Sequence, residues 1–237
     1  MNKTVLIIKN ITREGPGLIE KILQENLIYY DVVDLSTDER APDSKNYGTL
    51  IVLGGPDSAN DKTPKIKNEI KFIKNWIAAK KSFLGICLGL QLLVKAAGGK
   101  VIKSRTKEVG FRDPEGNLFE VELLKNSQKD PLLYKLGKKI RVFHLHGETV
   151  TLTKKMQVLG KGKYCQNQIV KVADRAYGLQ GHFELTERML DIWLSEDPEL
   201  KRLDAKKVRA DFDEIKEEYE RTANQIFTNF LKIAKLI

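Results

Sequence analysis

The chain has 237 residues, 41% hydrophobic and 31% charged, a composition that supports a buried core and excludes a wholly disordered chain. The longest nearly continuous apolar run, residues 83–94, contains Gln91 and falls short of the roughly 20 residues that span a bilayer. Lysine and arginine number 41 against 32 acidic residues, a net charge of +9. These charges are interleaved, as in residues 62–69, and therefore predict a solvated surface. A nucleic-acid-binding protein is the weakest alternative, because it rests on net charge alone.

The N-terminus and the cysteines bear on the cellular compartment. The apolar stretch at residues 5–8 is too short for the core of a signal peptide. The two cysteines, Cys87 and Cys165, cannot form a disulfide framework, and no Cys-x-x-Cys or Cys/His cluster indicates a metal site. We therefore expect a cytoplasmic protein with no membrane partner, no metal and no other cofactor.

Strand and helix patterns alternate through the first 97 residues. Short β-rich apolar runs predict strands at residues 5–8, 31–35, 49–53 and 82–86. Helical spacing of apolar residues predicts helices at residues 18–27, from Pro64 onward and at residues 88–97. This rhythm predicts right-handed crossovers and an open, largely parallel sheet with helices on both faces, an α/β fold.

The pattern changes after residue 101. Short strand-like runs at residues 117–124, 140–145, 157–159 and 168–172 predict a mixed or antiparallel extension of the same sheet, with a hairpin turn at residues 115–117. Residues 186–194 and 203–237 are predicted to be helical. Without repeats or a low-complexity linker, we expect residues 1–195 to form the α/β domain. Residues 196–237 should form a C-terminal helical extension packed on it.

Residues 83–91 (FLGICLGLQ) carry the most informative motif. They read as a strand, a sharp turn and a helix, with Cys87 at the turn and glycines two positions away on each side, Gly85 and Gly89. This pattern is typical of a nucleophile elbow with cysteine in place of serine. The positive end of the following helix favours a thiolate. The alternative is an ordinary buried cysteine, which the paired glycines disfavour.

A thiolate nucleophile needs a base and a group that orients the base. Of the three histidines, His182 follows a strand-like run and has Glu184 two positions later, on the same side of an extended segment. We therefore predict that Glu184 orients His182 toward Cys87. The alternative is a structural histidine. Cys165 lacks flanking glycines and is expected not to be catalytic.

Acyl chemistry also needs an oxyanion hole. Gly54, Gly55 and Pro56 follow the third predicted strand, so they should lie at the same edge of the sheet as the elbow. The backbone N–H groups of Gly55 and of Leu88, the residue after the nucleophile, are the predicted donors. An ordinary strand-ending turn is the alternative for the glycines.

Together, residues 54–58 (GGPDS), 85–91 (GICLGLQ) and 178–184 (GLQGHFE) resemble the three signature segments of the class I (triad) glutamine amidotransferases, in the family's order. The resemblance covers about residues 1–195 and implies a flavodoxin-like fold. It also implies a triad of Cys87, His182 and Glu184. Gly181 and Phe183 depart from the family pattern around the histidine, which predicts an altered pocket wall.

The resemblance also implies where substrate binds. Gly54, Gln91, Gly110 and Phe111 are expected near the glutamyl group, the last two within residues 108–111. Residues 144–148 (HLHGE) are similar to a segment of stand-alone members. The implied activity is hydrolysis of the side-chain amide of glutamine, or of a γ-glutamyl compound, through a cysteine thioester.

Three alternatives stay open for the function. The enzyme could deliver ammonia to a separate synthetase or acceptor subunit. It could act alone as a γ-glutamyl peptidase or hydrolase without an ammonia acceptor. It could also be a degenerate regulatory subunit on the same fold, a reading motivated by Gly181 and Phe183.

Overall fold

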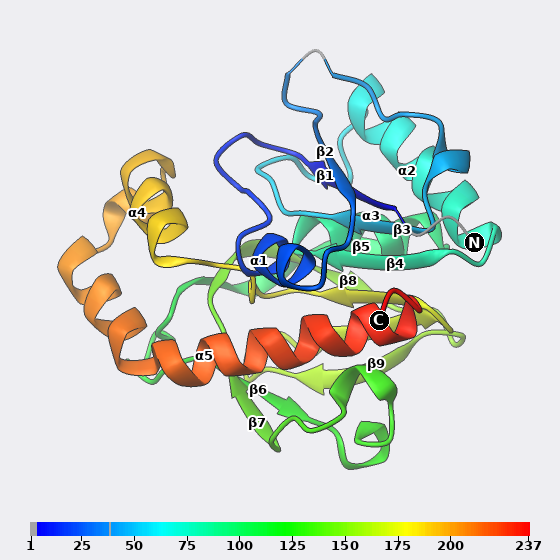
Figure 1. Cartoon of the computed structure of the whole chain (residues 1–237). Coiled ribbons are helices and arrows are strands. Elements are labelled where there is room, and N and C mark those ends of the chain that lie inside the picture. Colours follow the sequence, from blue (N-terminus) through cyan, green and yellow to red (C-terminus); the bar gives the residue numbers. More distant parts are fainter. Residues whose placement is uncertain (1–3, 38) are drawn as a thin grey trace.

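The computed structural model describes residues 4–37 and 39–237. The strands of its main sheet are β1 (Val5–Lys9), β2 (Tyr30–Asp34), β3 (Thr49–Val52), β4 (Ser82–Ile86), β6 (Glu120–Leu123), β7 (Lys139–Arg141), β9 (Gln157–Lys161), β10 (Ile169–Ala173) and β11 (Ala176–Leu179). Within the described residues this sheet has nine strands, in the order β2-β1-β3-β4-β11-β10-β9-β6-β7 (Figure 1). Strands β2 to β11 in that order are parallel, and the others pair antiparallel. The predicted α/β fold and its antiparallel extension are therefore confirmed.

Helices cover both faces of the sheet, as predicted. The α-helices are α1 (Leu18–Glu25), α2 (Pro64–Ala78), α3 (Leu88–Ala96), α4 (Glu187–Glu196) and α5 (Ala205–Ile233), and short 3₁₀ turns are η1 (Ser44–Asn46), η2 (Lys125–Ser127), η3 (Pro131–Leu133) and η4 (Leu200–Arg202). Alternate residues of β1 point to opposite faces. Val5 and Ile7 join one core cluster with α1, α4 and α5, whereas Leu6 and Ile8 join a second with α2 and α3. The long α5 crosses the molecule in Figure 1.

Polar side chains fix the beginnings of three helices. The side chain of Thr63 accepts from the backbone N–H of Ile66, and Pro64 occupies the first turn of α2. Thr186 caps α4 and Asp204 caps α5 in the same manner. None of the helices in the described part of the chain is long and apolar enough to cross a membrane.

One part of the predicted sheet is wrong. The predicted strand at residues 140–145 is split between β7 and a further strand, β8 (His144–Thr151), which pairs antiparallel with β5 (Lys100–Gly110) in a separate two-stranded sheet. A strand covered by helices on both faces must be apolar on both faces. The alternating lysine and arginine residues of β5 exclude it from such a position, and β5 forms a half-exposed ribbon instead.

The site lies where the parallel strands end. Strands β1, β3, β4 and β11 run in the same direction, so the loops that follow them meet at one edge of the sheet. These loops carry Glu14, Gly55, Cys87 and His182, all of which line one cavity.

Candidate active site

Cys87 lies at the turn between β4 and α3 with φ 51° and ψ −105°, in a left-handed region that is costly for a residue with a Cβ. Its N–H donates to the carbonyl of Leu179 on the neighbouring β11 at 2.8 Å, and its carbonyl accepts from Gln91 N at 3.2 Å. The neighbouring strand and the first helical turn thus hold the strained backbone in place. This is the conformation expected of a nucleophile elbow.

The glycines on either side of Cys87 are required by space. A Cβ at Gly85 would overlap the backbone of Gly89 and lie 2.7 Å from Leu90 N. A Cβ at Gly89 would overlap the carbonyl oxygen of Val52 on β3. Any larger residue at either position would push α3 away from the sheet, so the glycines allow the sharp turn that presents Cys87.

His182 and Glu184 form a buried pair after β11. Nδ1 of His182 lies 2.7 Å from Oε1 of Glu184, and both side chains are 1% exposed. The second carboxylate oxygen, Oε2, accepts from the backbone N–H of Phe183 at 3.0 Å. Because Nδ1 faces Glu184, Nε2 is the ring nitrogen left for Cys87.

The electrostatics of His182 follow from these neighbours. Burial of the imidazole alone would lower the pKa of His182. The adjacent Glu184 carboxylate and hydrogen bonds with Cys87 and Glu184 outweigh burial and raise that pKa well above its usual value. The imidazolium form, which His182 takes when it accepts a proton, is therefore stabilised at this site.

The C-terminal helices hold the histidine from behind. The hydroxyl of Tyr219 on α5 donates to the carbonyl of His182 at 2.8 Å and accepts from Leu185 N at 3.3 Å. The indole of Trp193 on α4 packs edge-to-face on the His182 ring, with centroids 5.0 Å apart. These contacts restrict both the backbone and the ring of His182.

A cavity of about 420 Å³ opens over Cys87. Among the residues predicted for the oxyanion hole and for substrate binding, Gly55, Leu88 and Gln91 line it. The N–H of Leu88 belongs to the first turn of α3, where amides have no acceptor within the helix. Gln91 Nε2 donates to the carbonyl of Glu148 at 3.2 Å, which fixes its side chain.

Gly54 lies beneath the reacting groups. A Cβ at this position would overlap Oε2 of Glu14 and lie 3.0 Å from Cε1 of His182 and 3.5 Å from Cβ of Cys87. Glycine at position 54 thus leaves room for three functional side chains to approach one another.

Besides Gly54, which lies outside the cavity lining, two predicted substrate-binding residues are not brought to this cavity. Gly110 (φ 85°) and Phe111 lie outside its lining. The Phe111 ring is 2% exposed and packs against Phe143 and Phe212, with centroids 4.8 Å and 5.7 Å away. Lys107, on the same strand, lines the cavity instead.

The departures from the family pattern also lie outside the cavity lining. A Cβ at Gly181 would overlap Val142 and lie 2.8 Å from Cε1 of His144, so this position has no room for a side chain. Phe183 is fully buried and stacks on Tyr219, with ring centroids 6.4 Å apart. Both residues pack the segment around His182 against its neighbours, Gly181 against Val142 and His144 and Phe183 against Tyr219. Neither forms the pocket wall.

Sequence reasoning missed Glu14, in the loop after β1. It is 4% exposed, lines the cavity, and has no hydrogen-bond partner at Oε2. Burial raises the pKa of Glu14 to about 7, although His182 acts in the opposite direction. A carboxylate after a parallel strand, at the edge already assigned to Cys87, was the available signal.

The cavity rim was missed as well. Arg13 pairs with Asp197 at 2.7 Å, and Lys107 pairs with Glu199 at 2.8 Å. Asp197 and Glu199 follow α4, so the segment between α4 and α5 forms part of the rim. No short-range pattern predicts these pairs.

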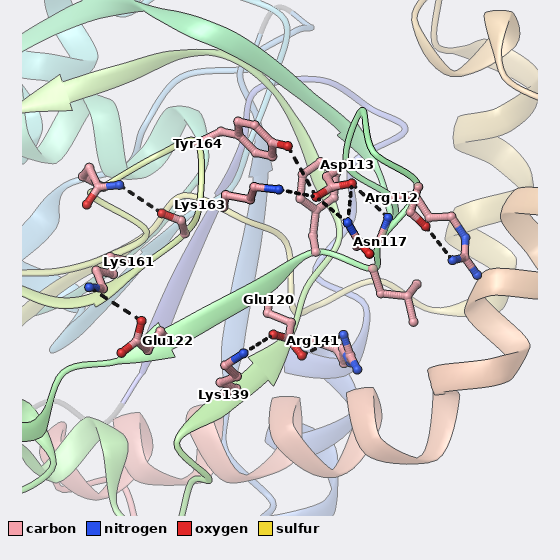
Figure 2. Close-up of a pocket in the computed structure, with 15 residues that line it drawn as sticks. Arg112, Asp113, Asn117, Glu120, Glu122, Lys139, Arg141, Lys161, Lys163 and Tyr164 are labelled. Atoms are coloured by element: carbon pink, nitrogen blue, oxygen red, sulfur yellow. Dashed lines mark hydrogen bonds and ion pairs between the residues drawn. The ribbon is translucent and has the colours of Figure 1, made fainter.

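A larger hollow of about 730 Å³ lies elsewhere, along β6, β7 and β9 (Figure 2). Its basic residues pair with neighbouring acids: Lys139 and Arg141 with Glu120, and Lys161 with Glu122. Its lining holds no cysteine, serine, threonine or histidine, so it does not compete with the Cys87 cavity as a reaction site.

Comparison with known proteins finds relatives of similar sequence. It is 31% identical over 150 residues to the glutamine amidotransferase-like protein YfeJ of Salmonella typhimurium, covering 61% of this chain and 60% of YfeJ. It is 28% identical over 188 residues to the glutamine-hydrolyzing GMP synthase of Borrelia garinii, covering 78% of this chain and 33% of the synthase. The chain thus spans less than two thirds of either relative.

A solved structure matches over nearly its whole length. The crystal structure of a glutamine amido transferase from Methylobacillus flagellatus has a TM-score of 0.86 at 26% identity, covering 98% of this chain and 96% of that chain. The family model for glutamine amidotransferase class-I matches residues 17–195, well over half of the sequence. The chain therefore belongs to the class-I glutamine amidotransferase family.

Proposed function

We propose that this chain hydrolyses the side-chain amide of glutamine, or of a γ-glutamyl compound, through a thioester on Cys87. One observation carries the proposal: the strained Cys87 turn and His182 line one cavity, and the buried carboxylate of Glu184 lies behind His182, 2.7 Å from its Nδ1. Family membership supports an amidase or amidotransferase in general.

In the proposed reaction, Sγ of Cys87 attacks the γ-carbonyl carbon of the substrate, and the thiol proton passes to Nε2 of His182. The oxygen that becomes negative accepts from the N–H groups of Gly55 and Leu88. Collapse of the tetrahedral intermediate breaks the C–N bond, and His182 gives its proton to the leaving ammonia or amine. Water, deprotonated by His182, then attacks the thioester and releases the carboxylate product and the thiol.

Glu184 keeps the proton on Nδ1 and stabilises the imidazolium during these transfers. The Nε2 amide of Gln180 lies 3.8 Å from Sγ and donates toward the sulfur, which favours negative charge there. Both groups are buried, so water does not weaken their effect.

The first form is an enzyme that acts alone, and the match over 96% of the chain of a solved glutamine amido transferase supports it. We propose a separate acceptor as the second form of the function, because a glutamine-hydrolyzing GMP synthase matches this chain over only 33% of its own length. In that form, ammonia released at Cys87 would pass to another protein.

The test is a substrate panel of glutamine, glutathione and γ-glutamyl dipeptides, with ammonia release and mass-spectrometric product analysis. Turnover of any member by the wild type and none by Cys87→Ala supports the proposal. Turnover only after addition of cell extract indicates a partner-dependent enzyme. No turnover under either condition, and no labelling of Cys87 by a glutamine-like electrophile, would favour a regulatory subunit.

A further inference from the structure

A second group of reactive side chains lies beside the cavity and has no part in the proposed reaction. Glu108 of β5 and His144 and His146 of β8 are 1%, 1% and 5% exposed. Glu108 is the direct partner of His146 in the antiparallel register, and His144 lies two residues away on the same face. One possible ligand atom from each residue lies within 4.8 Å of the others.

The distances between these atoms suit a shared ion. Nε2 of His146 lies 3.0 Å from Oε2 of Glu108, and Nε2 of His144 lies 3.9 Å from Oε1. Despite its short distance, His146 Nε2 makes no hydrogen bond. Ligands on a tetrahedral ion with bonds of about 2.0–2.1 Å lie roughly 3.3–3.5 Å apart, between the two observed spacings.

The surroundings of His146 supply the second contact that a metal-binding histidine needs. Nδ1 of His146 lies 3.1 Å from the carbonyl oxygen of Glu148. Donation of the Nδ1 proton to this carbonyl leaves the lone pair on Nε2, the atom 3.0 Å from Oε2 of Glu108. This arrangement selects the tautomer of His146 that can bind a metal.

Gln168, the residue before β10, offers a fourth ligand. Its Nε2 donates to Glu108 Oε2 at 3.0 Å and lies 3.3 Å from His144 Nε2, whereas its buried Oε1 has no partner. Rotation of the amide by 180° exchanges these atoms and directs Oε1 toward the three other ligands. The side chain can thus serve either the hydrogen-bonded cluster or an ion.

The charge of the cluster also favours a cation. Among the residues that the structure describes, no lysine or arginine forms an ion pair with Glu108, whose other neighbours are histidines and an amide. A buried carboxylate needs a compensating charge or strong hydrogen bonds. A divalent ion would meet this need while using both histidines as neutral ligands.

We propose that Glu108, His144 and His146, with Gln168 as a fourth ligand, bind a divalent transition-metal ion, with Zn²⁺ best suited to this donor set. The ion has a positioning role. Leu145 lies between the two histidines, and its carbonyl oxygen accepts from Cys87 Sγ at 3.7 Å. Anchoring both neighbours of Leu145 would fix this contact and the cavity wall formed by His146.

The test uses the full-length chain with Cys87→Ala and Cys165→Ala, so that neither thiol can bind the metal. Zn²⁺ is removed with chelator, and titration calorimetry and elemental analysis after dialysis measure its return. We expect about one ion per chain. Glu108→Gln and His144→Gln should weaken binding by at least roughly 100-fold, since loss of an outer-sphere partner alone typically costs 10–100-fold. Glu115→Gln, at an exposed acid, is the matched control.

A second measurement needs no ligand variant. Cd²⁺ bound to the cysteine-free chain should give a ¹¹³Cd NMR signal in the range of nitrogen and oxygen ligands, and Zn²⁺ should raise the Tm of the same chain. Failure of the cysteine-free chain to retain either ion would overturn the proposal. Unchanged affinity in folded Glu108→Gln and His144→Gln would also overturn it. Because Cys87 is absent throughout, neither result depends on the proposed hydrolysis.

Discussion

The substitution Glu184→Gln tests the proposed reaction most directly, because it preserves side-chain shape and removes one charge. In the wild type both carboxylate oxygens accept hydrogen bonds, one facing Nδ1 of His182 at 2.7 Å and the other receiving Phe183 N–H at 3.0 Å. An amide cannot replace both. If its oxygen faces Nδ1, its NH₂ group faces the Phe183 N–H, and two buried donors oppose each other.

The other amide orientation satisfies Phe183 but damages the chemistry. The NH₂ group then donates to Nδ1, which forces the proton of His182 onto Nε2. A protonated Nε2 cannot accept the thiol proton. Loss of the acid's charge in a comparable serine triad lowers turnover by about 10⁴. A thiol beside a helix N-terminus depends less on its base. We therefore expect a loss of roughly 10 to 1,000-fold in kcat, or about 1.4 to 4 kcal/mol.

The pH dependence should change in a defined direction. The Glu184 carboxylate helps to raise the pKa of His182 well above its usual value, against the effect of burial. Removal of the charge must lower that pKa, so the His182 inflection in the pH profile of kcat/KM should move to lower pH. KM should change little, because Glu184 does not line the cavity.

The assay is steady-state ammonia release with the best substrate of the panel, measured across pH for wild type, Glu184→Gln and Glu187→Gln. Glu187 is the matched control, since its side chain is 65% exposed and pairs with Lys216 on the surface. Near-wild-type rates and superimposable pH profiles for both variants would refute the role of Glu184, and with it the triad.

Three further predictions concern the nucleophile, the elbow and a buried acid. Cys87→Ala should abolish hydrolysis with an unchanged Tm, whereas Cys165→Ala should retain turnover; the reverse result would reject the elbow assignment. Gly89→Ala should lower the unfolding free energy by roughly 1–3 kcal/mol, because the new Cβ overlaps β3. Gly15→Ala, with open space around the new Cβ, should not lower it, and urea unfolding of the two variants measures the difference. Burial raises the pKa of Glu69 to about 7 from 4.5, so the folded state holds a proton that the unfolded state loses, and stability falls as pH rises through that window. Glu69→Gln should remove up to about 3 kcal/mol of this fall in unfolding free energy between pH 4.5 and 8. Parallel curves of unfolding free energy against pH for the wild type and Glu69→Gln would contradict the prediction.

Local patterns were sufficient for the parallel half of the fold. Strands β1, β3 and β4 are apolar on both faces. Helices α1 and α2 carry apolar stripes, and Thr63 caps α2, so these signals can be recognised over a few residues. The run at residues 140–145 was misassigned because hydrophobicity does not record which sheet a strand joins. Ile140 lies in β7 and His144 in β8, and Phe143 between them pairs its backbone with His182.

The candidate site likewise has a part that local sequence predicted and a part that it did not. The Cys87 turn and the His182–Glu184 pair were predictable because each depends on residues within a few positions of one another. The Glu108 cluster was not, since its members come together only through the β5–β8 register. Gly110 and Gly181 show that a glycine in a motif does not reveal its role in the site. Gly110 has a left-handed φ away from the cavity, and Gly181 makes room for Val142 and His144.

The C-terminal helix explains how a histidine in a loop keeps a fixed orientation. His182 follows the end of β11, where no further strand residues constrain it, yet its carbonyl accepts from Tyr219 and its N–H donates to Phe143 O at 2.8 Å. Tyr219 is fully buried and sits on the face of α5 that joins the core, so its position depends on the packing of the whole helix. Buried hydrogen bonds of this kind are costly to leave unmade. Docking of α5 therefore sets the backbone from which His182 reaches Cys87, and a helix that contributes no reacting group becomes a condition for the geometry of the site.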